Sequence, residues 1–174
     1  MLASIGRNAT SEELMKLERY DIEKHHKDIA DFRLSDTTYT DTPENVAQSA
    51  KADPNRHAIA ILNDEDKLVG FFCLHLTEGP ETYGFKGEHY ALIRGLSIDD
   101  RYRRKGYASK VFSDPFFFIQ SQIDVRITHL ILAVNEKNIP AQKTYVKAGF
   151  DVLKRGVSGS RGTLLVMGKR CLIN

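Results

Sequence analysis

The 174-residue sequence contains only two cysteines, Cys73 and Cys171, which lie far apart in the chain. They form no C-x-x-C pair, and no histidine cluster stands at metal-ligand spacing beside them, so a zinc ribbon and a disulfide framework are both excluded. We therefore expect no metal site. So few cysteines fit a protein of the reducing cytoplasm.

Long hydrophobic runs are also missing. No stretch approaches the roughly 18 apolar residues needed to cross a bilayer, and residues 1–20 contain no apolar signal segment. The net charge is only +2, well short of the strong basicity that is typical of a dedicated nucleic-acid binder. Neither a membrane nor a nucleic acid is expected as a partner.

The composition that remains is that of an ordinary folded protein, with 41% hydrophobic and 28% charged residues. The length suits one domain with a continuous core. No internal repeat, low-complexity tract or long linker divides the chain, so we expect residues 1–174 to form a single domain.

Apolar periodicity and turn signals predict the elements of the first half. A short strand over residues 14–19, starting at Leu14, is followed by an amphipathic helix within residues 20–35. The apolar positions of this helix are Ile22, His26, Ile29, Ala30 and Phe32. An N-cap threonine and the proline after it start a second helix at residue 43. Two apolar strands over residues 57–62 and 67–76 then form an antiparallel hairpin.

The second half is predicted to begin with a polar, glycine-bearing loop over residues 77–89. A buried strand over Tyr90–Ile98 and a helix over residues 106–123 follow. Ser113-Asp114-Pro115 resembles an N-cap with a proline at the first helical position, so this helix is expected to kink or restart there. The remaining elements are a strand, a helix and two strands, over residues 128–134, 139–148, 150–157 and 163–169. This order predicts an α+β fold around a mixed sheet.

Positive charge is most concentrated in the stretch DDRYRRKGYASK, residues 99–110, where a strand passes into a helix. Four cations precede Gly106, namely Arg101, Arg103, Arg104 and Lys105. A helix N-terminus presents unpaired backbone N–H groups, and glycine lets an anion approach them closely. The stretch matches neither a Walker A loop nor G-x-G-x-x-G. It is therefore either a solvated turn or a site for the pyrophosphate of a small molecule.

Two motifs in the sequence resemble signatures of the GNAT superfamily of N-acyltransferases. The pattern N-x-x-A-x-x-x-Y-x-x-x-G-F is matched by Asn138, Ala141, Tyr145, Gly149 and Phe150. Earlier in the chain, the acetyl-CoA pattern R/Q-x-x-G-x-G/A is matched by Arg103, Gly106 and Ala108. Each motif follows a predicted strand and opens a predicted helix, and the resemblance is specific from Tyr90 to Phe150.

The resemblance implies a GNAT-like fold and its co-substrate. This fold is a central, twisted, mostly antiparallel sheet of about seven strands, flanked by about four helices. The fourth and fifth strands, here Tyr90–Ile98 and Thr128–Val134, splay apart in a V. Acetyl-CoA is implied as the co-substrate bound in that gap, with an amine as the acceptor. A homodimer is also compatible, because family members often dimerise through their late strands.

The resemblance further implies which residues bind the cofactor. Backbone amides at the helix start would bind the pyrophosphate, and they belong to Arg104, Lys105, Gly106, Tyr107, Ala108 and Ser109, with Arg103 before them. The pantetheine arm would pair with backbone groups of Leu96, Ser97 and Ile98, one of which would also bind the oxyanion. Asn138 and Ala141 would contact the cofactor as well. Asn138 is equally suited to be a helix N-cap.

The catalytic groups are less completely implied. Tyr145 would act as general acid for the leaving thiolate, although a half-buried tyrosine can also serve packing alone. Many family members carry a glutamate early in the strand that contacts pantetheine, and here Leu92 stands at that position. The candidates for the general base are Glu88 and His89 at the mouth of this strand, acting directly or through a water chain, and His75 on the neighbouring strand.

The acceptor is predicted to be a primary amine: a small-molecule amine, a polyamine, an amino acid or a peptide amine. In the family it lies against the first two helices and the loop here over residues 77–88, where acidic residues could attract a cation. These are Asp21, Glu23, Asp28, Asp31, Asp36, Asp41, Glu44, Glu78, Glu81 and Glu88. Arg94, in the middle of the predicted strand Tyr90–Ile98, instead favours an acceptor that carries a carboxylate, such as an amino acid. A non-catalytic acyl-CoA sensor is the alternative function, and RNA binding by the basic stretch is the third.

Overall fold

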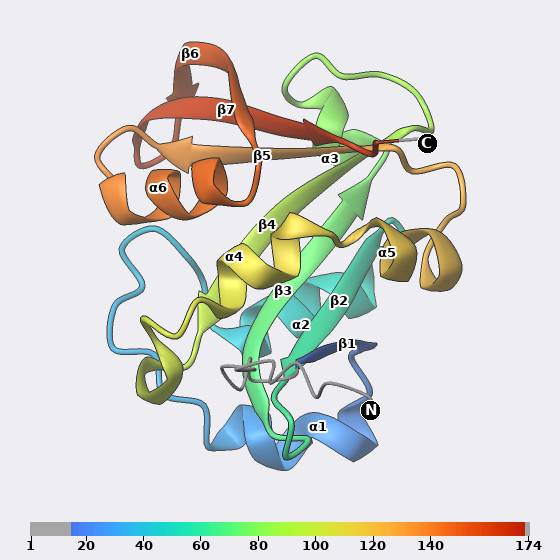
Figure 1. Ribbon diagram of the computed structural model, residues 1–174, viewed down its shortest axis with the longest axis vertical. Helices are drawn as coiled ribbons and strands as arrows, with labels where there is room; N and C mark the ends of the chain where they lie inside the picture. The colour runs from blue at the N-terminus through green and yellow to red at the C-terminus, as the bar shows by residue number, and fades with distance from the viewer. Residues whose placement is uncertain (1–14, 173–174) are drawn as a thin grey trace, which may run out of the picture.

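The computed structural model describes residues 15–172 and places seven strands in one sheet (Figure 1). They are β1 (Lys16–Arg19), β2 (Arg56–Leu62), β3 (Leu68–Leu76), β4 (Tyr90–Ile98), β5 (His129–Asn135), β6 (Asp151–Gly159) and β7 (Gly162–Arg170). The order is β1-β2-β3-β4-β5-β7-β6, and every neighbouring pair is antiparallel except β4 and β5. The predicted mixed, mostly antiparallel sheet is confirmed. Leu14, the predicted start of the first strand, lies outside the described residues.

Six α-helices lie within the described residues, where the sequence predicts about four. They are α1 (Ile22–Ala30), α2 (Pro43–Ala52), α3 (Glu78–Glu81), α4 (Tyr107–Ser113), α5 (Phe116–Gln122) and α6 (Ile139–Lys147), and a 3₁₀ turn over Asp100–Tyr102 precedes α4. The short α3 lies in a segment predicted as a loop, because its glycine and proline are loop signals. The separation of α4 from α5 confirms the predicted restart at Pro115. The predicted side-chain cap is wrong, since Pro115 itself occupies the cap position of α5.

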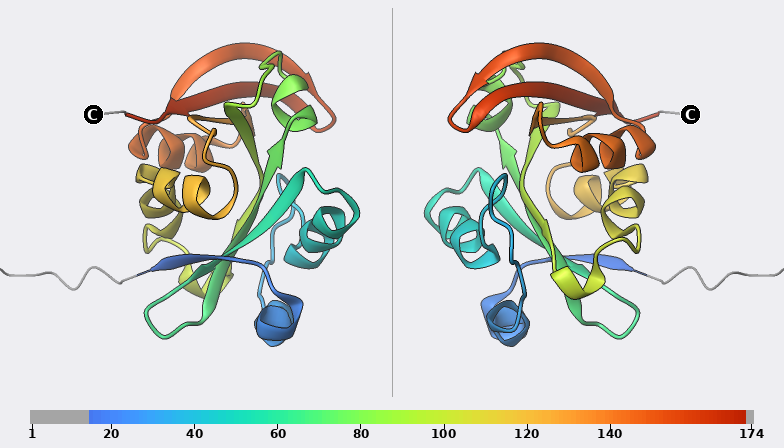
Figure 2. Two further views of the ribbon diagram at one scale, coloured as in Figure 1. Left: turned by 90° about the vertical axis from the view of Figure 1, so that its right-hand side faces the viewer. Right: turned by 90° about the vertical axis from the view of Figure 1, so that its left-hand side faces the viewer.

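The helices cover both faces of the sheet (Figure 2). On one face, α4, α5 and α6 pack over a large apolar cluster that includes Phe72, Phe112 and Leu130. On the other face, α1 and α2 pack over a smaller cluster that includes Ile29, Val46 and Phe71. None of the helices formed by residues 15–172 combines the length and apolar character needed to cross a membrane.

Helix α1 forms as predicted but buries a different face. His25 and Ile29 are buried, whereas Ile22 and His26 are exposed. The prediction that His26 lies on the buried face is wrong, and a polar contact of its neighbour His25 explains why. The Nε2 of His25 lies 3.1 Å from a carboxylate oxygen of Glu18 on β1, so this contact, and not apolar burial, selects the inward histidine.

The sheet opens between β4 and β5, as the resemblance to the GNAT superfamily implies. Only Tyr90–Ile93 pair with His129–Leu132, and the strands diverge beyond them. At this point β4 has a bulge, in which Gly95 and Leu96 stand opposite a single residue of β3. Gly95 has a φ of +63°, and a Cβ there would lie 2.7 Å from Val46 of α2. Glycine is therefore required at the point where the sheet opens.

One ammonium group joins the C-terminal ends of two helices to β7. The Nζ of Lys169 donates hydrogen bonds to the carbonyls of Phe112 (3.0 Å) and Ala148 (2.7 Å), and also to that of Ser113. These carbonyls lie at the ends of α4 and α6, where the helix dipole favours a cation. Lys169 thereby fixes the two neighbouring helices to each other and to the sheet.

Candidate active site

A cavity of about 1360 Å³ opens where β4 and β5 diverge. Its lining includes residues of both strands, the first turn of α4, the length of α6, the loop before α2 and the turn between β6 and β7. The volume exceeds the ~300–1,000 Å³ that is typical of a pocket for one small ligand. The cavity therefore has room for a large cofactor and a second molecule.

The basic loop, residues 103–109, forms one wall of this cavity. Arg104 has a φ of +63° and Gly106 a φ of +79°, so the chain enters the left-handed region twice before α4 begins. The Oγ of Ser109 donates to the Gly106 carbonyl at 3.1 Å. The first backbone N–H groups of α4 have no partner within the helix, and successive amides of this kind bind anions.

The basic stretch divides into residues with different tasks. Arg101 lies outside the cavity lining and donates to both carboxylate oxygens of Asp99, at 3.0 and 2.8 Å, and to Asp31 at 3.1 Å. Asp99 is fully buried. Burial by itself raises the pKa of Asp99, but hydrogen bonds from Arg101 and Arg33 outweigh it and lower that pKa below its ordinary value. Arg101 is thus structural, while Arg103 and Arg104 line the cavity.

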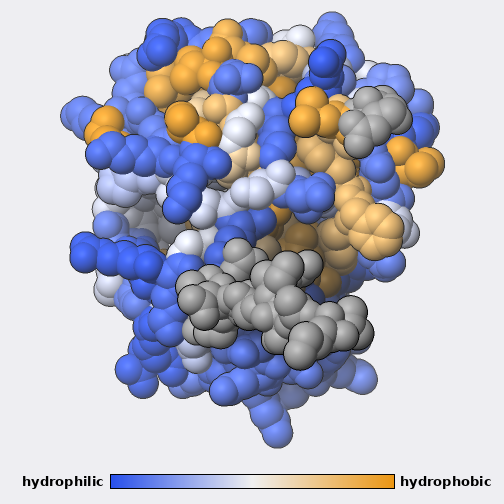
Figure 3. Space-filling model, viewed as in Figure 1, coloured by the Kyte–Doolittle hydropathy of each residue, from blue (hydrophilic) through white to orange (hydrophobic). Residues whose placement is uncertain are grey.

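A smaller groove of about 380 Å³ continues outward from the basic loop. It is lined by Arg104, Lys105, Gly106, Ser109, Lys110, Ser113 and Lys147. Hydrophilic residues dominate the side of the molecule on which α4 and α6 begin, at the left of Figure 3. Four cationic side chains in one groove make this part of the surface suited to a phosphate group.

The diverging part of β4 supplies the opposite wall. Leu96, Ser97 and Ile98, which the resemblance implies as contacts of the pantetheine arm, all line the cavity. The carbonyl of Leu96 accepts a hydrogen bond of 2.9 Å from the hydroxyl of Thr40, in the loop before α2. The hydroxyl of Ser97 is buried without a partner among the described residues. It is a polar group available to a ligand.

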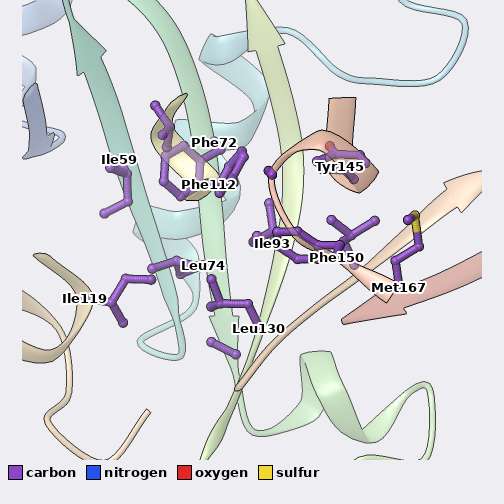
Figure 4. Packing of buried hydrophobic residues seen from close by; sticks show 14 of the residues in the cluster. Ile59, Phe72, Leu74, Ile93, Phe112, Ile119, Leu130, Tyr145, Phe150 and Met167 are labelled. Carbon is purple, nitrogen blue, oxygen red and sulfur yellow. The ribbon is translucent and has the colours of Figure 1, made fainter. Parts of the chain in front are cut away.

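Helix α6 brings Asn138, Ala141 and Tyr145 to the same cavity. Asn138 is the N-cap of the helix, because its Oδ1 accepts a hydrogen bond of 3.4 Å from the N–H of Ala141. The ring of Tyr145 packs beside those of Phe112 and Phe150, with ring centroids 6.2 and 5.7 Å away (Figure 4). Burial raises the pKa of Tyr145. Its hydroxyl has no hydrogen bond to any other residue between 15 and 172, so a ligand can accept its proton.

The predicted bases lie apart from these groups. Glu88 is 70% exposed and forms an ion pair of 2.8 Å with Arg126. His89 is exposed, and its Nδ1 lies 3.1 Å from the Arg126 carbonyl. Neither residue lines the cavity. The structure therefore leaves only a relay through water between either side chain and an acceptor in the cavity.

A row of polar side chains crosses the α2-side face of the sheet. Arg56 stands opposite His75, and Cys73 opposite Arg94, so strand alternation places all four on one face. We call them the polar row. Arg56, Cys73 and Arg94 line the cavity. Burial raises the pKa of Cys73 to about 11, so its thiol is neutral near pH 7.

Two further residues contribute to the cavity through long-range contacts. Arg161, in the turn between β6 and β7, donates to the carbonyls of Thr37 at 3.0 Å and Thr38 at 2.9 Å. With the Thr40 bond to Leu96, these contacts hold the loop before α2 against the cavity. No local motif identifies Arg161 or Thr40, because their partners lie far away in the sequence.

Within residues 15–172 no three His, Cys, Asp or Glu side chains are arranged to hold a metal ion.

Comparison with known proteins agrees with this geometry. The model of the acetyltransferase (GNAT) family matches residues 20–150. The chain is 30% identical over 146 residues to the "uncharacterized N-acetyltransferase YbbJ" of Bacillus subtilis (strain 168), which covers 83% of this chain and 90% of YbbJ.

Solved structures of acetyltransferases share the fold. The aminoglycoside acetyltransferase AAC(6')-Ib, in complex with coenzyme A, has a TM-score of 0.68 at 14% identity, over 90% of this chain and 95% of that chain. The acetyltransferase of the GNAT family from Streptococcus pneumoniae has a TM-score of 0.62 at 16% identity, over 91% of this chain and 99% of that chain.

Proposed function

Because the chain belongs to the GNAT family of acetyltransferases, we propose that it transfers the acetyl group of acetyl-CoA to a primary amine by direct attack in a ternary complex. One observation supports this most strongly. The basic loop and the Tyr145 side chain on α6 both line the one cavity at the splay of β4 and β5. An elongated cofactor with its phosphates at one end and its thioester at the other fits such a cavity.

In this proposal the chain holds acetyl-CoA mainly through its backbone. The amides of residues 104–109 bind the pyrophosphate, supported by the positive charge of Arg103 and Arg104. Leu96, Ser97 and Ile98 offer the strand edge that β5 leaves unpaired, which can hydrogen-bond the pantetheine arm. Asn138 and Ala141 complete the site from the start of α6. The Asn138 oxygen serves the helix cap, so its amide N–H₂ group is the part that remains for the cofactor.

The chemistry follows from these positions. The neutral amine attacks the thioester carbonyl, a backbone N–H of Leu96–Ile98 stabilises the oxyanion, and Tyr145 donates its proton to the leaving thiolate. A covalent acetyl-cysteine route is disfavoured, since Cys73, the cysteine that lines the cavity, keeps its proton near neutral pH. Direct transfer between two bound substrates is therefore the proposed order.

Glu88 and His89 stay the predicted bases, acting through water because they lie outside the cavity. The test is the pH profile of kcat/KM for the double variant Glu88→Gln with His89→Ala. A flattened or displaced limb on the acidic side would support the relay. A profile that matches the unmodified enzyme would place the base elsewhere.

The experiment that tests the proposed function measures CoA release from acetyl-CoA in the presence of a panel of primary amines, together with calorimetric binding of CoA. Turnover with at least one amine is expected. Tight CoA binding without turnover on any amine would instead support a sensor that binds acyl-CoA. Failure to bind CoA at all would overturn the proposal for the cavity.

A further inference from the structure

Arg94 is an arginine in the cavity without a carboxylate partner. Its Nη1 lies 3.1 Å from the Nδ1 of His75. No Asp or Glu oxygen among residues 15–172 lies within ion-pair distance of its guanidinium. A guanidinium has five N–H donors, and this contact uses one of them. The others remain available in a cavity that Arg94 lines.

His75 holds this guanidinium in position. Burial, followed by the charges of Arg56 and Arg94, lowers the pKa of His75, so the ring is neutral near pH 7 and accepts on Nδ1. Its proton then lies on Nε2, which is 3.6 Å from a carboxylate oxygen of Asp53 and 3.9 Å from one of Glu78. The Nε2 makes no hydrogen bond within the described residues, so the Nδ1 contact is the one by which His75 supports Arg94.

The charges around the cavity favour an anionic group on the acceptor. Among the described residues the lining contains eight cationic side chains, which are Arg56, Arg94, Arg103, Arg104, Lys137, Lys143, Lys147 and Arg161. It contains two acidic ones, Asp36 and Asp41. The cations of the basic loop and of α6 lie near the predicted phosphate end, whereas Arg56 and Arg94 lie on the sheet.

Eight of the ten acidic residues that the sequence suggests for attracting a cation lie outside the cavity lining. Asp31 pairs with Arg101, and Asp28 accepts the backbone N–H of Leu68 at 3.0 Å. Of the two sheet arginines, Arg56 lies 3.4 Å from Asp53, which offsets its charge. Arg94 therefore carries the uncompensated positive charge of the polar row.

We propose that the acceptor is an amino acid or a close relative, a primary amine that also bears a carboxylate, and that Arg94 binds this carboxylate. This inference rests on the proposed function. Arg94 directly precedes the bulge of β4, so it lies next to the part of the strand assigned to the thioester. A carboxylate held there by two parallel N–H donors would place an amine a few bonds away at the reacting carbon.

The step balances without a further reactant. The amine nitrogen forms a bond to the acetyl carbon, the carbon–sulfur bond breaks, and the thiolate takes the Tyr145 proton, which is restored from solvent. The ammonium form of the acceptor loses one proton to the general base before the attack, and the nitrogen loses a second after the carbon–nitrogen bond has formed. Since one proton ends on the CoA thiol, the reaction releases one proton overall. The products are the N-acetyl amino acid, with its carboxylate unchanged, and CoA.

The test compares each L-amino acid with its own carboxamide as acceptor, at equal concentration, by CoA release and by detection of the acetylated product. We expect the acids to exceed their amides in kcat/KM by about 10- to 100-fold, the range for a hydrogen bond to a charged group. Equal rates for acids and amides would overturn the inference and leave the proposed function standing. If no acid reacts, binding of N-acetyl amino acids to the CoA complex is measured by calorimetry, and absence of binding would also overturn it.

Variants separate recognition from folding. Arg94→Gln should lower kcat/KM for the acid by the same 10- to 100-fold, leave that for the carboxamide unchanged, and leave CoA binding unchanged. Arg155→Gln is the matched control, since Arg155 is exposed on β6 and lies outside the cavity. A loss that is equal for acid and amide would show that Arg94 supports the fold or the cofactor instead, and would contradict the proposal.

Discussion

Replacing Tyr145 by phenylalanine should abolish most of the acetyl transfer and leave the protein folded. The ring of Tyr145 packs against Phe112 and Phe150, and phenylalanine keeps those contacts. The lost hydroxyl has no hydrogen-bond partner among the residues that the structure describes. We therefore expect the free energy of unfolding to change by less than about 0.5 kcal/mol.

The expected loss of kcat is about 10²- to 10⁴-fold, the contribution of a positioned general acid. The KM for acetyl-CoA should change little, because the hydroxyl acts on the leaving sulfur and not on the phosphates. The assay is steady-state CoA release, with a thermal melt of the same preparation. Tyr20→Phe is the matched control, since Tyr20 packs against Phe71 in the cluster beneath α1 and α2.

The pH dependence gives a second check on Tyr145. Burial raises its pKa, so it keeps its proton while a primary amine acceptor loses its own, up to about pH 10. The kcat/KM of the unmodified enzyme should therefore rise with pH and show no falling limb from this tyrosine in that range. An unchanged kcat in Tyr145→Phe, or a loss of rate that follows a loss of folded protein, would refute the assigned role.

Three further outcomes are expected. Gly106→Val should weaken CoA binding by on the order of 10- to 100-fold. The control is Gly156→Val, because Gly156 has a similar positive φ of +66° but no neighbouring atom within 4 Å of an added Cβ, so this variant should cost comparable backbone strain without changing the affinity. Equal calorimetric Kd values for the two variants would contradict the assignment of the basic loop to CoA. Asp99→Asn should lower the free energy of unfolding by about 2–3 kcal/mol at pH 7. Because the pKa of Asp99 is depressed in the folded protein, this stabilisation is present above about pH 4 and is lost as the pH falls through the folded value. In urea titrations at falling pH, the difference in unfolding free energy between the unmodified protein and the variant should therefore shrink. A difference that stays constant would count against the ion pair. Lys169→Met should lower the free energy of unfolding by about 2 kcal/mol, and an unaltered thermal melt would show that the helix ends do not need the ammonium.

The sequence was sufficient for the elements whose signals are local. The Tyr90–Ile98 strand, the restart at Pro115 and the helix that begins after Asn138 all follow from apolar runs and capping residues, and each is present in the structure. The V-shaped splay came from the resemblance to a family, since nothing in the composition of β4 requires its neighbour to diverge. Gly95 stands at the point where the strands diverge. The sequence alone does not explain why a glycine is needed there, because the side chain that excludes a Cβ belongs to Val46 on α2.

Contacts between distant residues explain what could not be predicted. His25 is buried in place of His26 because of Glu18, on another element. Arg101 looks equivalent to Arg103 in the sequence, but Asp99 and Asp31 hold it away from the cavity. Glu88 and His89 directly precede β4 in the sequence. They lie at the end of β4 that is still paired with β5, whereas the cavity opens toward the other end of the strand. In each case the partner side chain, and not the residue's own neighbourhood, decides its place.

The ammonium of Lys169 has a consequence for maps of mutational sensitivity. Helices α4 and α6 both line the cavity and both end on this one group, so a change at Lys169 disturbs two elements of the cavity lining at once. A saturation mutagenesis screen scored by enzyme activity would therefore find sensitive positions along both helices and at Lys169 on β7. Such a screen would not distinguish the residues that contact a ligand from those that hold the helices in place. Affinity measured on purified, folded variants would be needed to separate the residues that touch the cofactor from the one that holds the two helices together.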